Sequence, residues 1–398
     1  MNIIFHIDVN NAFLSWTAVD MLRNGYDVDI RNIPSVIGGD EEQRRGIVVA
    51  KSPVAKKFGV VTAEPLYMAR RKCPGLKVFP GNHELYEKES NKLYEYLKTF
   101  TPDTERYSID ECFLDLSGTK YLYNDYMKLA RDMQKYINDN FGITVNIGIA
   151  CNRLCAKMAS DFEKPNKIHT LFPNEIESKM WPLPVGELFM VGKKSAALLN
   201  QIGIYTIGDL AKADINLLTK YFKNNASSMI NSARGIDNSK VSKYVPKDQS
   251  ISVSETLPKD VDNLVDLQNI LLYQADRVGI QLRKEKKYTG TIAVIFKNKD
   301  FISYSHQKKL DVPINSTEEI YKVAVDVLKK GWRGDKIRLI GIRLGSLTEK
   351  RVKQFSLFDM NTEDDVDKIQ DVLDKINDKY GSCKITVASM KKNKNISD

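Results

Sequence analysis

The segment IIFHIDVNNAF occupies residues 3–13 and contains the first change from a strand pattern to a helix pattern. Apolar residues alternate along residues 3–9, which predicts a strand with His6 and Asp8 on one face. A helix is expected from Ala12 to Arg23, with Gly25 placed to end it. A carboxylate at the end of an apolar strand costs energy unless a positive group meets it. We therefore expect a cationic partner for Asp8.

A second acidic segment, YSIDECFLD at residues 107–115, predicts another strand beside the pair Asp110 and Glu111. Neighbouring strand residues point to opposite faces, so both acids reach one site only if the backbone bends or just enters the strand there. Magnesium ions prefer oxygen ligands, and a pair of ions needs several of them close together. Taken one at a time, each acid is more commonly a solvated strand-end residue.

Strands and helices alternate through the first half of the chain. Strand patterns occur at residues 46–50 and 143–150, and helix patterns at residues 66–73, 83–99 and 121–140. This alternation predicts an α+β arrangement in which helices cover a sheet.

The second half contains a helical region and then a separate domain. Beyond Trp181, glycine turns separate helices in two consecutive helix-hairpin-helix units. Residues 237–249 are polar and aperiodic, as in a linker. Four strand patterns follow with two helices, which predicts a four-stranded α/β domain; they lie near residues 250–257, 289–297, 301–310 and 337–347.

Composition narrows the class of protein. The 60 Lys and Arg residues exceed the 51 Asp and Glu residues, and the net charge of +9 favours a polyanionic partner. No apolar run approaches the roughly 20 residues of a membrane span, and no signal peptide is recognisable, so we expect a cytoplasmic protein without membrane contact. The 5 cysteines form no CxxC pair, which favours free thiols over a zinc site.

Three segments resemble, in order and spacing, the motifs of the Y-family (translesion) DNA polymerases: DVNNAF at residues 8–13, YSIDECFLD at residues 107–115 and GIACNRLCAKMASDFEKPN at residues 148–166. The resemblance covers about residues 1–350. It implies an α+β multidomain fold, a right-hand polymerase with a palm sheet, small fingers, a helix-hairpin-helix thumb and a four-stranded α/β little finger. The implied parts are palm 1–20 and 78–167, fingers 21–77, thumb 168–236, linker 237–249, little finger 250–349 and tail 350–398.

The resemblance also implies the metal site and the sugar-selecting residue. Asp8, Asp110, Glu111 and the backbone carbonyl of Val9 are expected to bind two Mg²⁺ ions. Phe13 is expected to be the steric gate, whose ring leaves no room for the 2′-hydroxyl of a ribonucleotide. Without the surrounding motif, Phe13 would be an ordinary core residue of the first helix.

Lysines are expected to bind the triphosphate of the incoming dNTP. By resemblance, Lys164 is the main candidate and Lys56 a second one. Family members usually have Tyr-x-x-Arg in the fingers, whereas here Pro53 and Lys56 occupy those positions. Lysine keeps the charge but lacks the two-pronged geometry of arginine.

Contacts with primer–template DNA are expected in the thumb and the little finger, mostly to phosphates. The expected residues are Gly192, Lys193, Lys194, Ser252, Arg283 and Lys284. In the tail, QFSLF at residues 354–358 resembles the peptide that binds bacterial sliding clamps, with Gln354, Leu357 and Phe358 as anchors. The alternative is a tail segment that packs on its own domain.

These features together predict a monomeric, template-directed DNA polymerase. Low fidelity is expected because the sequence lacks a second acidic cluster that could serve a proofreading exonuclease. The alternative from another class of protein is a non-catalytic DNA-binding scaffold. Asp8, Asp110 and Glu111 speak against it, because a scaffold has no need of three uncompensated acids. A nucleotidyl cyclase or reverse transcriptase would leave the helix-hairpin-helix and little-finger segments unexplained.

Overall fold

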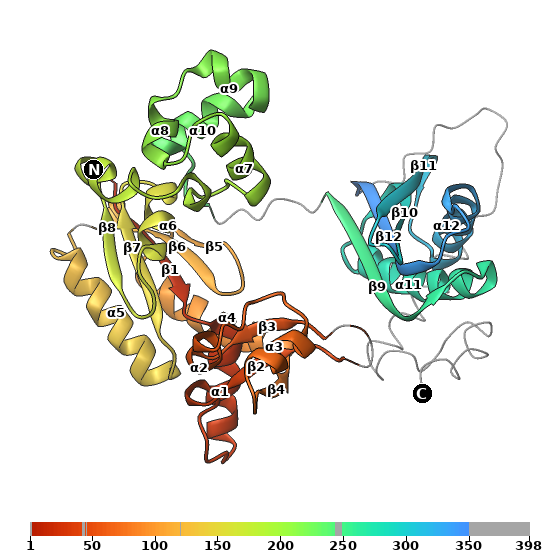
Figure 1. Cartoon of the computed structure of the whole chain (residues 1–398), viewed down its shortest axis with the longest axis horizontal. Coiled ribbons are helices and arrows are strands. Elements are labelled where there is room, and N and C mark those ends of the chain that lie inside the picture. Colours follow the sequence, from red (N-terminus) through yellow and green to blue (C-terminus); the bar gives the residue numbers. More distant parts are fainter. Residues whose placement is uncertain (1, 42–43, 45, 120, 243–248, 350–398) are drawn as a thin grey trace. The chain divides into compact units, whose positions relative to one another are not determined.

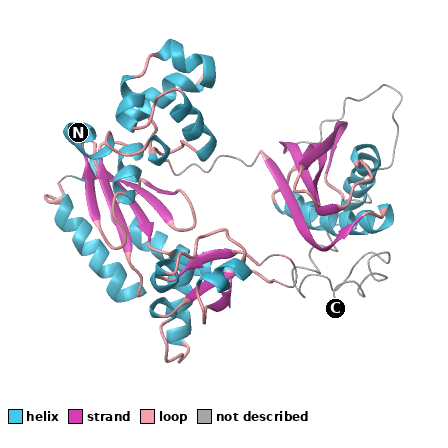
Figure 2. Cartoon of the chain, in the orientation of Figure 1, coloured by secondary structure: helices cyan, strands magenta, loops and turns pink. Residues whose placement is uncertain are grey.

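The computed structural model describes residues 2–41, 44, 46–119, 121–242 and 249–349 (Figure 1). Contacts divide the chain into two units. One unit comprises Met1–Gly39 and Gly46–Val245, and the other comprises Asp40–Arg45 and Pro246–Asp398. Helices and strands occur in both units, as Figure 2 shows and as the sequence predicts.

The palm of the first unit is a five-stranded sheet in the order β5-β6-β1-β7-β8. Its strands are β1 (Ile4–Val9), β5 (Thr104–Arg106), β6 (Glu111–Asp115), β7 (Val145–Ala150) and β8 (Ile168–Leu171). The central strand β1 runs antiparallel to both neighbours, β6 and β7. The predicted strand alternation is confirmed, because Phe5 and Ile7 lie in one core cluster and Ile4 lies in another.

Helices cover both faces of the palm sheet. Phe5 and Ile7 share their core with α4 (His83–Lys98) and α5 (Tyr126–Phe141). Ile4 shares its core with α6 (Arg153–Asp161). The helix expected from residue 121 begins later because the side chain of Asp125 accepts a hydrogen bond from the backbone N–H of Lys128 and caps α5 there.

Helix α6 approaches β7 very closely at Gly148. A Cβ atom on Gly148 would lie 1.9 Å from the carbonyl oxygen of Ala156 and 2.6 Å from the backbone nitrogen of Ser160. Both atoms belong to the helix backbone, so no side-chain rotation relieves the clash. Gly148 is therefore required for this packing.

Gly148→Ala is expected to destabilise the protein by about 3 kcal/mol, the upper part of the usual range for overpacking. Chemical denaturation of the full chain measures the change. Gly118→Ala is the matched control, because a Cβ atom there meets nothing within 4 Å. Equal stability of the two variants would contradict the close approach of α6 to β7.

The fingers form a small subdomain with its own sheet. The sheet has the order β3-β2-β4 and consists of β2 (Ser35–Gly38), β3 (Val48–Lys51) and β4 (Lys77–Pro80). Its helices are α2 (Pro53–Lys57) and α3 (Leu66–Lys72), and α1 (Ala12–Arg23) packs nearby. Val36, Val48 and Leu66 are fully buried between these elements. The segment expected as the fingers therefore has a separate apolar core.

The thumb consists of four short helices joined by tight turns. They are α7 (Lys193–Gln201), α8 (Ile207–Lys212), α9 (Ile215–Phe222) and α10 (Asn225–Ala233). Gly203 follows α7 at a positive φ of 85°, which glycine adopts without strain. Thr206 and Asp209 then form a capping box that begins α8. The predicted helix-hairpin-helix turn is thus present between α7 and α8.

The second unit contains a four-stranded antiparallel sheet in the order β11-β10-β12-β9. Its strands are β9 (Ser250–Val261), β10 (Tyr288–Asn298), β11 (Ser303–Ile314) and β12 (Ile337–Thr348). Helices α11 (Leu264–Lys284) and α12 (Thr317–Gly331) share its apolar core. The predicted four-stranded domain with two helices is confirmed.

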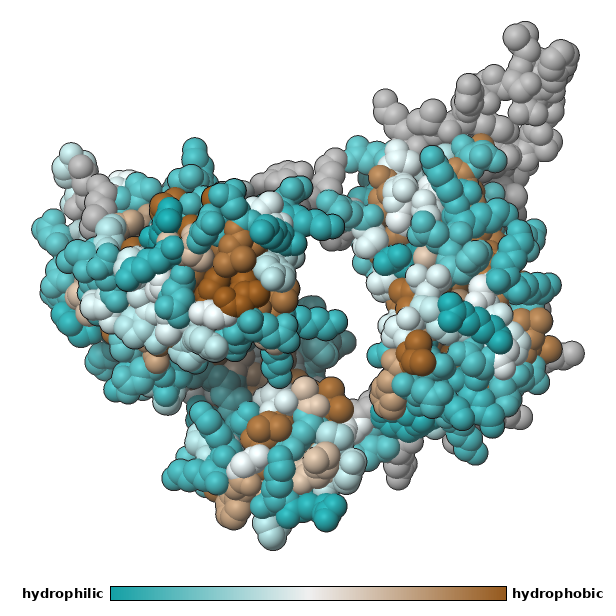
Figure 3. Space-filling model, turned by 45° about the horizontal axis from the view of Figure 1, so that its top comes forward, coloured by the Kyte–Doolittle hydropathy of each residue, from teal (hydrophilic) through white to brown (hydrophobic). Residues whose placement is uncertain are grey.

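Two other expectations concern the surface and the tail. Hydrophilic residues cover most of the face seen in Figure 3. In the part of the chain that the structure describes, no helix combines the length and apolar character of a membrane span. The peptide at 354–358, which is expected to bind a sliding clamp, lies outside the described residues.

Candidate active site

Two of the predicted metal ligands face each other across neighbouring strands. Asp8, near the end of β1, is the direct cross-strand partner of Glu111 at the start of β6. Opposed residues of an antiparallel pair lie on the same face of the sheet. The register therefore brings together two acids that are far apart in the sequence.

Asp110 lies just outside the strand. Strand β6 begins at Glu111, so Asp110 need not follow the alternation of strand side chains. Its Oδ1 accepts a hydrogen bond from Ser108 Oγ at 2.7 Å, and its backbone carbonyl accepts one from the Val9 N–H at 3.0 Å. The expectation that the chain only just enters the strand here is confirmed.

Two lysines neutralise the facing acids. Lys164 Nζ lies 2.5 Å from Asp8 Oδ2, and Lys157 Nζ lies 2.7 Å from Glu111 Oε1. Lys164 also contacts Asp161 Oδ1 at 2.8 Å. The expected cationic partner of Asp8 is thus Lys164, the same residue that the sequence assigns to the triphosphate.

Burial and charge act differently on the two acids. Burial raises the pKa of Asp8, and the neighbouring Lys164 offsets this shift only in part. Burial also raises the pKa of Glu111, but interactions with His6 and Lys157 outweigh it and bring that pKa down to about 2. The net shift of the pKa is therefore upward for Asp8 and downward for Glu111.

These residues fit a divalent cation by their chemistry. Asp8, Asp110 and Glu111 offer carboxylate oxygens at one end of the sheet, the donor type that hard cations prefer. The raised pKa of Asp8 indicates that additional positive charge would stabilise its ionised form. Among the described residues, no group of three or more His, Cys, Asp or Glu side chains already converges as a metal cluster. Two of the three acids are paired with lysines instead.

Phe13 lies in a cluster of aromatic rings beside this site. Its ring stacks on Tyr86, with centroids 4.7 Å apart and planes 25° apart. The ring of Phe13 also packs edge-on against His83. Phe13 is only partly buried, and it packs against the core of the palm sheet.

The fingers carry lysines just before a short helix and in its last turn. Lys56 lies on α2 and is exposed, and Ser52 caps this helix by accepting from the Ala55 N–H. Burial lowers the pKa of Lys51, and the charge of Lys56 lowers it further. Lys51 and Lys56 are therefore close enough for their charges to interact.

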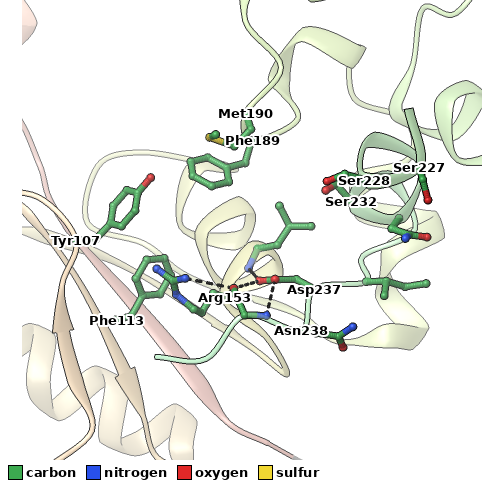
Figure 4. A pocket seen from close by; sticks show the side chains of 14 residues that line it. Tyr107, Phe113, Arg153, Phe189, Met190, Ser227, Ser228, Ser232, Asp237 and Asn238 are labelled. Carbon is green, nitrogen blue, oxygen red and sulfur yellow. Dashed lines mark hydrogen bonds between the residues drawn. The ribbon is translucent and has the colours of Figure 1, made fainter. Parts of the chain in front are cut away.

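A pocket of about 580 Å³ lies between the palm and the thumb (Figure 4). The rings of Tyr107, Phe113 and Phe189 line one part of it, and serines of α10 line another. Arg153 also lines the pocket, with Nη2 2.6 Å from Glu105 Oε1 and its guanidinium carbon 4.7 Å from the centre of the Phe113 ring. This arginine is therefore already paired in the present arrangement.

The predicted DNA-binding residues differ in their surroundings. Gly192, Lys193 and Lys194 are exposed at the start of α7. Ser252 is exposed on β9, an edge strand of the four-stranded sheet in the second unit. Arg283 is only partly exposed and donates to the Asn315 carbonyl at 2.9 Å, whereas its neighbour Lys284 is exposed. Their contacts with DNA remain predictions.

Known proteins are similar to most of this chain. Residues 7–161 match the impB/mucB/samB family, residues 248–357 match the C-terminal domain of that family, and residues 173–204 match its helix-hairpin-helix motif. The DNA polymerase IV of Clostridium acetobutylicum is 46% identical over 95% of this chain and 96% of the relative. The chain belongs to the impB/mucB/samB family of Y-family DNA polymerases.

Other relatives and solved structures agree with this family. The DNA polymerase IV 1 of Bacillus subtilis is 34% identical over 96% of this chain and 91% of that protein. A Y-family DNA polymerase chimera superposes with a TM-score of 0.76 at 25% identity, covering 87% of this chain and 99% of the chimera. An insertion ternary complex of Dbh DNA polymerase gives a TM-score of 0.59, with 86% and 98% covered. As a family member, the chain is a DNA-directed DNA polymerase that uses divalent metal ions.

Sequence reasoning missed two residues of this Y-family site. Lys157 lies in the third motif but was assigned no role from the sequence, and its ammonium contacts Glu111. His6 is fully buried behind the acids and has its Nε2 3.8 Å from Glu111 Oε2. For His6 the available signal was the strand alternation, which predicts that His6 and Asp8 lie on the same face of the strand. No local pattern linked Lys157 to Glu111.

Proposed function

We propose that this Y-family polymerase extends a primer 3′-hydroxyl with dNTPs by two-metal phosphoryl transfer, in low-fidelity translesion synthesis. The observation that carries the proposal is the Asp8–Glu111 cross-strand pair with Asp110 beside it. Primer extension with Mg²⁺, repeated with EDTA, separates this activity from a DNA-binding scaffold.

The proposed roles follow from the positions of the side chains. Asp8, Asp110, Glu111 and the backbone carbonyl of Val9 would hold two Mg²⁺ ions. When bound, these ions supply the charge that activates the primer hydroxyl and neutralises the triphosphate. Lys164 lies beside Asp8 and would bind the phosphates that leave as pyrophosphate.

Phe13 would exclude ribonucleotides from this site, and Lys56 would contribute positive charge from the fingers. The thumb residues Gly192, Lys193 and Lys194 would bind DNA phosphates through backbone amides and charge. The little-finger residues Ser252, Arg283 and Lys284 would add further contacts with the primer–template DNA.

Lys164→Ala is expected to raise the KM for dNTP about tenfold. A hydrogen bond to a charged group contributes about 1.5–3 kcal/mol, and each 1.4 kcal/mol corresponds to a factor of about ten. Steady-state single-nucleotide insertion measures the effect.

Two further variants control for the other contacts of Lys164. Lys164→Arg keeps the charge beside Asp8 and should recover most of the affinity. Lys167→Ala removes an exposed lysine that pairs with Glu163 at 3.3 Å on the same segment, and its KM should equal that of the wild type. An unchanged KM in Lys164→Ala would remove Lys164 from the phosphate site.

The peptide at 354–358 is proposed to bind a sliding clamp through Gln354, Leu357 and Phe358. Replacing Leu357 and Phe358 by alanine removes the apolar anchors, so we expect clamp stimulation of primer extension to disappear. The measured quantity is the ratio of extension with and without clamp, which should fall to about one. A ratio equal to that of the wild type would favour a tail that packs on its own domain.

The remaining proposals concern fidelity and organisation. We infer that the chain lacks a proofreading exonuclease, because no residue stretch of its sequence offers a second acidic cluster. The polymerase would work as a cytoplasmic monomer, with palm 1–20 and 78–167, fingers 21–77, thumb 168–236 and little finger 250–349. A mismatch-terminated primer tests proofreading, because an exonuclease would shorten it in the presence of Mg²⁺.

A further inference from the structure

A histidine with an unpartnered nitrogen lies behind the metal-binding acids. His6 is fully buried on β1, and its ring packs against Phe113 with centroids 4.5 Å apart. Nδ1 is 2.7 Å from Ser160 Oγ, but Nε2 has no hydrogen-bond partner. Nε2 faces Glu111 Oε2 across 3.8 Å. A buried polar atom without a partner is uncommon and calls for a physical reason.

The hydroxyl of Ser160 decides which nitrogen of His6 carries the proton. Ser160 Oγ also lies 2.8 Å from the Lys157 carbonyl, and a hydroxyl has only one hydrogen to donate. If Ser160 donates to that carbonyl, neutral His6 must donate from Nδ1, and the Nε2 lone pair then faces a carboxylate. If Ser160 donates to Nδ1 instead, Nε2–H points at Glu111. The second arrangement replaces a repulsion by an attraction, and it differs from the first by a rotation of the hydroxyl and by the ring proton lying on Nε2 instead of Nδ1.

Each carboxylate oxygen of Glu111 faces a nitrogen of a neighbouring side chain. Lys157 Nζ contacts Oε1 at 2.7 Å, and His6 Nε2 faces Oε2. Lys157 is itself held in place, because its ammonium lies 5.7 Å from the ring centre of Tyr107 and 5.4 Å from that of Phe189. Neither His6 nor Lys157 is free to move far, since both are buried. The two groups thus restrict the rotation of Glu111.

We propose that His6 is a positioning residue for the metal site, in which Nε2–H orients Glu111 Oε2 and Ser160 selects the required tautomer. This inference rests on the proposed function, in which Glu111 binds a divalent ion. A carboxylate that is already oriented loses less conformational entropy when it binds the ion. Groups that orient metal ligands typically change metal affinity by roughly 10–100-fold when they are removed. His6 therefore acts through Glu111 and does not contact the substrate.

Two amide substitutions distinguish positioning from packing. In His6→Gln the side-chain amide can reach the place of Nε2 and still donate toward Glu111. In His6→Asn the shorter amide reaches only the place of Nδ1, beside Ser160. We expect His6→Asn to lower the affinity of the full chain for Mn²⁺ by roughly 10–100-fold, and His6→Gln to stay much closer to wild type. Electron paramagnetic resonance of Mn²⁺ titrated without nucleotide measures this affinity independently of activity.

Controls separate the possible failures. Thermal unfolding in EDTA measures how each variant changes packing when no metal is bound. Equal losses of Mn²⁺ affinity in His6→Asn and His6→Gln would overturn the positioning role. Ser160→Ala, a small change in α6, should lower Mn²⁺ affinity in the same direction even if His6→Asn does not fold. Wild-type affinity in Ser160→Ala and in any folded His6→Asn protein would also overturn the inference. If Glu111→Gln binds Mn²⁺ like the wild type, the proposed metal site itself fails.

Discussion

Replacing Glu111 by glutamine is expected to reduce primer extension at least about a thousandfold. A bound metal ion stabilises transition-state charge by several kcal/mol, and each 1.4 kcal/mol corresponds to a factor of about ten. The substitution keeps the shape of the side chain but removes the charge, and it leaves Lys157 without its ion-pair partner. Single-nucleotide insertion under single-turnover conditions measures the change in the chemical step. Asp110→Asn is expected to act in the same direction.

Asp115→Asn provides a control on the same strand. Asp115 ends β6, and its Oδ1 accepts a hydrogen bond from the Ser117 N–H, away from the paired acids. Its insertion rate should stay near that of the wild type. Thermal unfolding separates lost chemistry from lost folding, because a folded but inactive Glu111→Gln protein is the expected result. Extension by Glu111→Gln at the rate of Asp115→Asn would refute the proposed metal ligands.

Replacing Phe13 by valine is expected to raise the incorporation of ribonucleotides relative to deoxyribonucleotides by roughly a hundredfold. A pocket that excludes a group by contact discriminates by about 1–3 kcal/mol, and removal of the ring opens that space. The ring of Phe13 stacks on Tyr86. We therefore expect no neighbouring side chain to move into the space that the ring leaves. The measured quantity is the ratio of kcat/KM for a dNTP and the matching rNTP.

Phe13→Tyr is the matched variant, because it keeps the ring and should keep most of the selectivity. Phe13→Val also removes aromatic packing against Tyr86, so the stability of both proteins needs to be compared. An unchanged selectivity in a folded Phe13→Val protein would make Phe13 a core residue of α1. A loss of dNTP and rNTP insertion by equal factors would have the same meaning.

Much of the fold follows from local patterns. Helix α1 has the expected ends at Ala12 and Arg23, and the later domain has the expected strands and helices. Strand alternation also predicted that Asp8 and His6 share a face. Predictions failed mainly at element ends, as for α5, where the single side chain of Asp125 determines the first turn.

The contacts of the acids could not be predicted in this way. Lys164 was expected to meet the triphosphate, and in the structure it contacts Asp8, 156 positions away. A dNTP or a metal ion would compete for these same charges, so both contacts are compatible with one lysine at different steps. The partner of Glu111 is Lys157, which the sequence places on a different element.

Strand alternation and the order of the three motifs can be read from the chain alone, and through them the resemblance to Y-family polymerases. Which cation meets which acid, and the position of the buried His6 behind Glu111, follow only from the folded arrangement. Both depend on the packing of α6 on the sheet, where Gly148 allows the helix backbone to approach β7 closely. That approach places Lys157 and Ser160 next to residues of β1 and β6. Such contacts depend on the separation of elements far apart in the chain, which local periodicity does not encode.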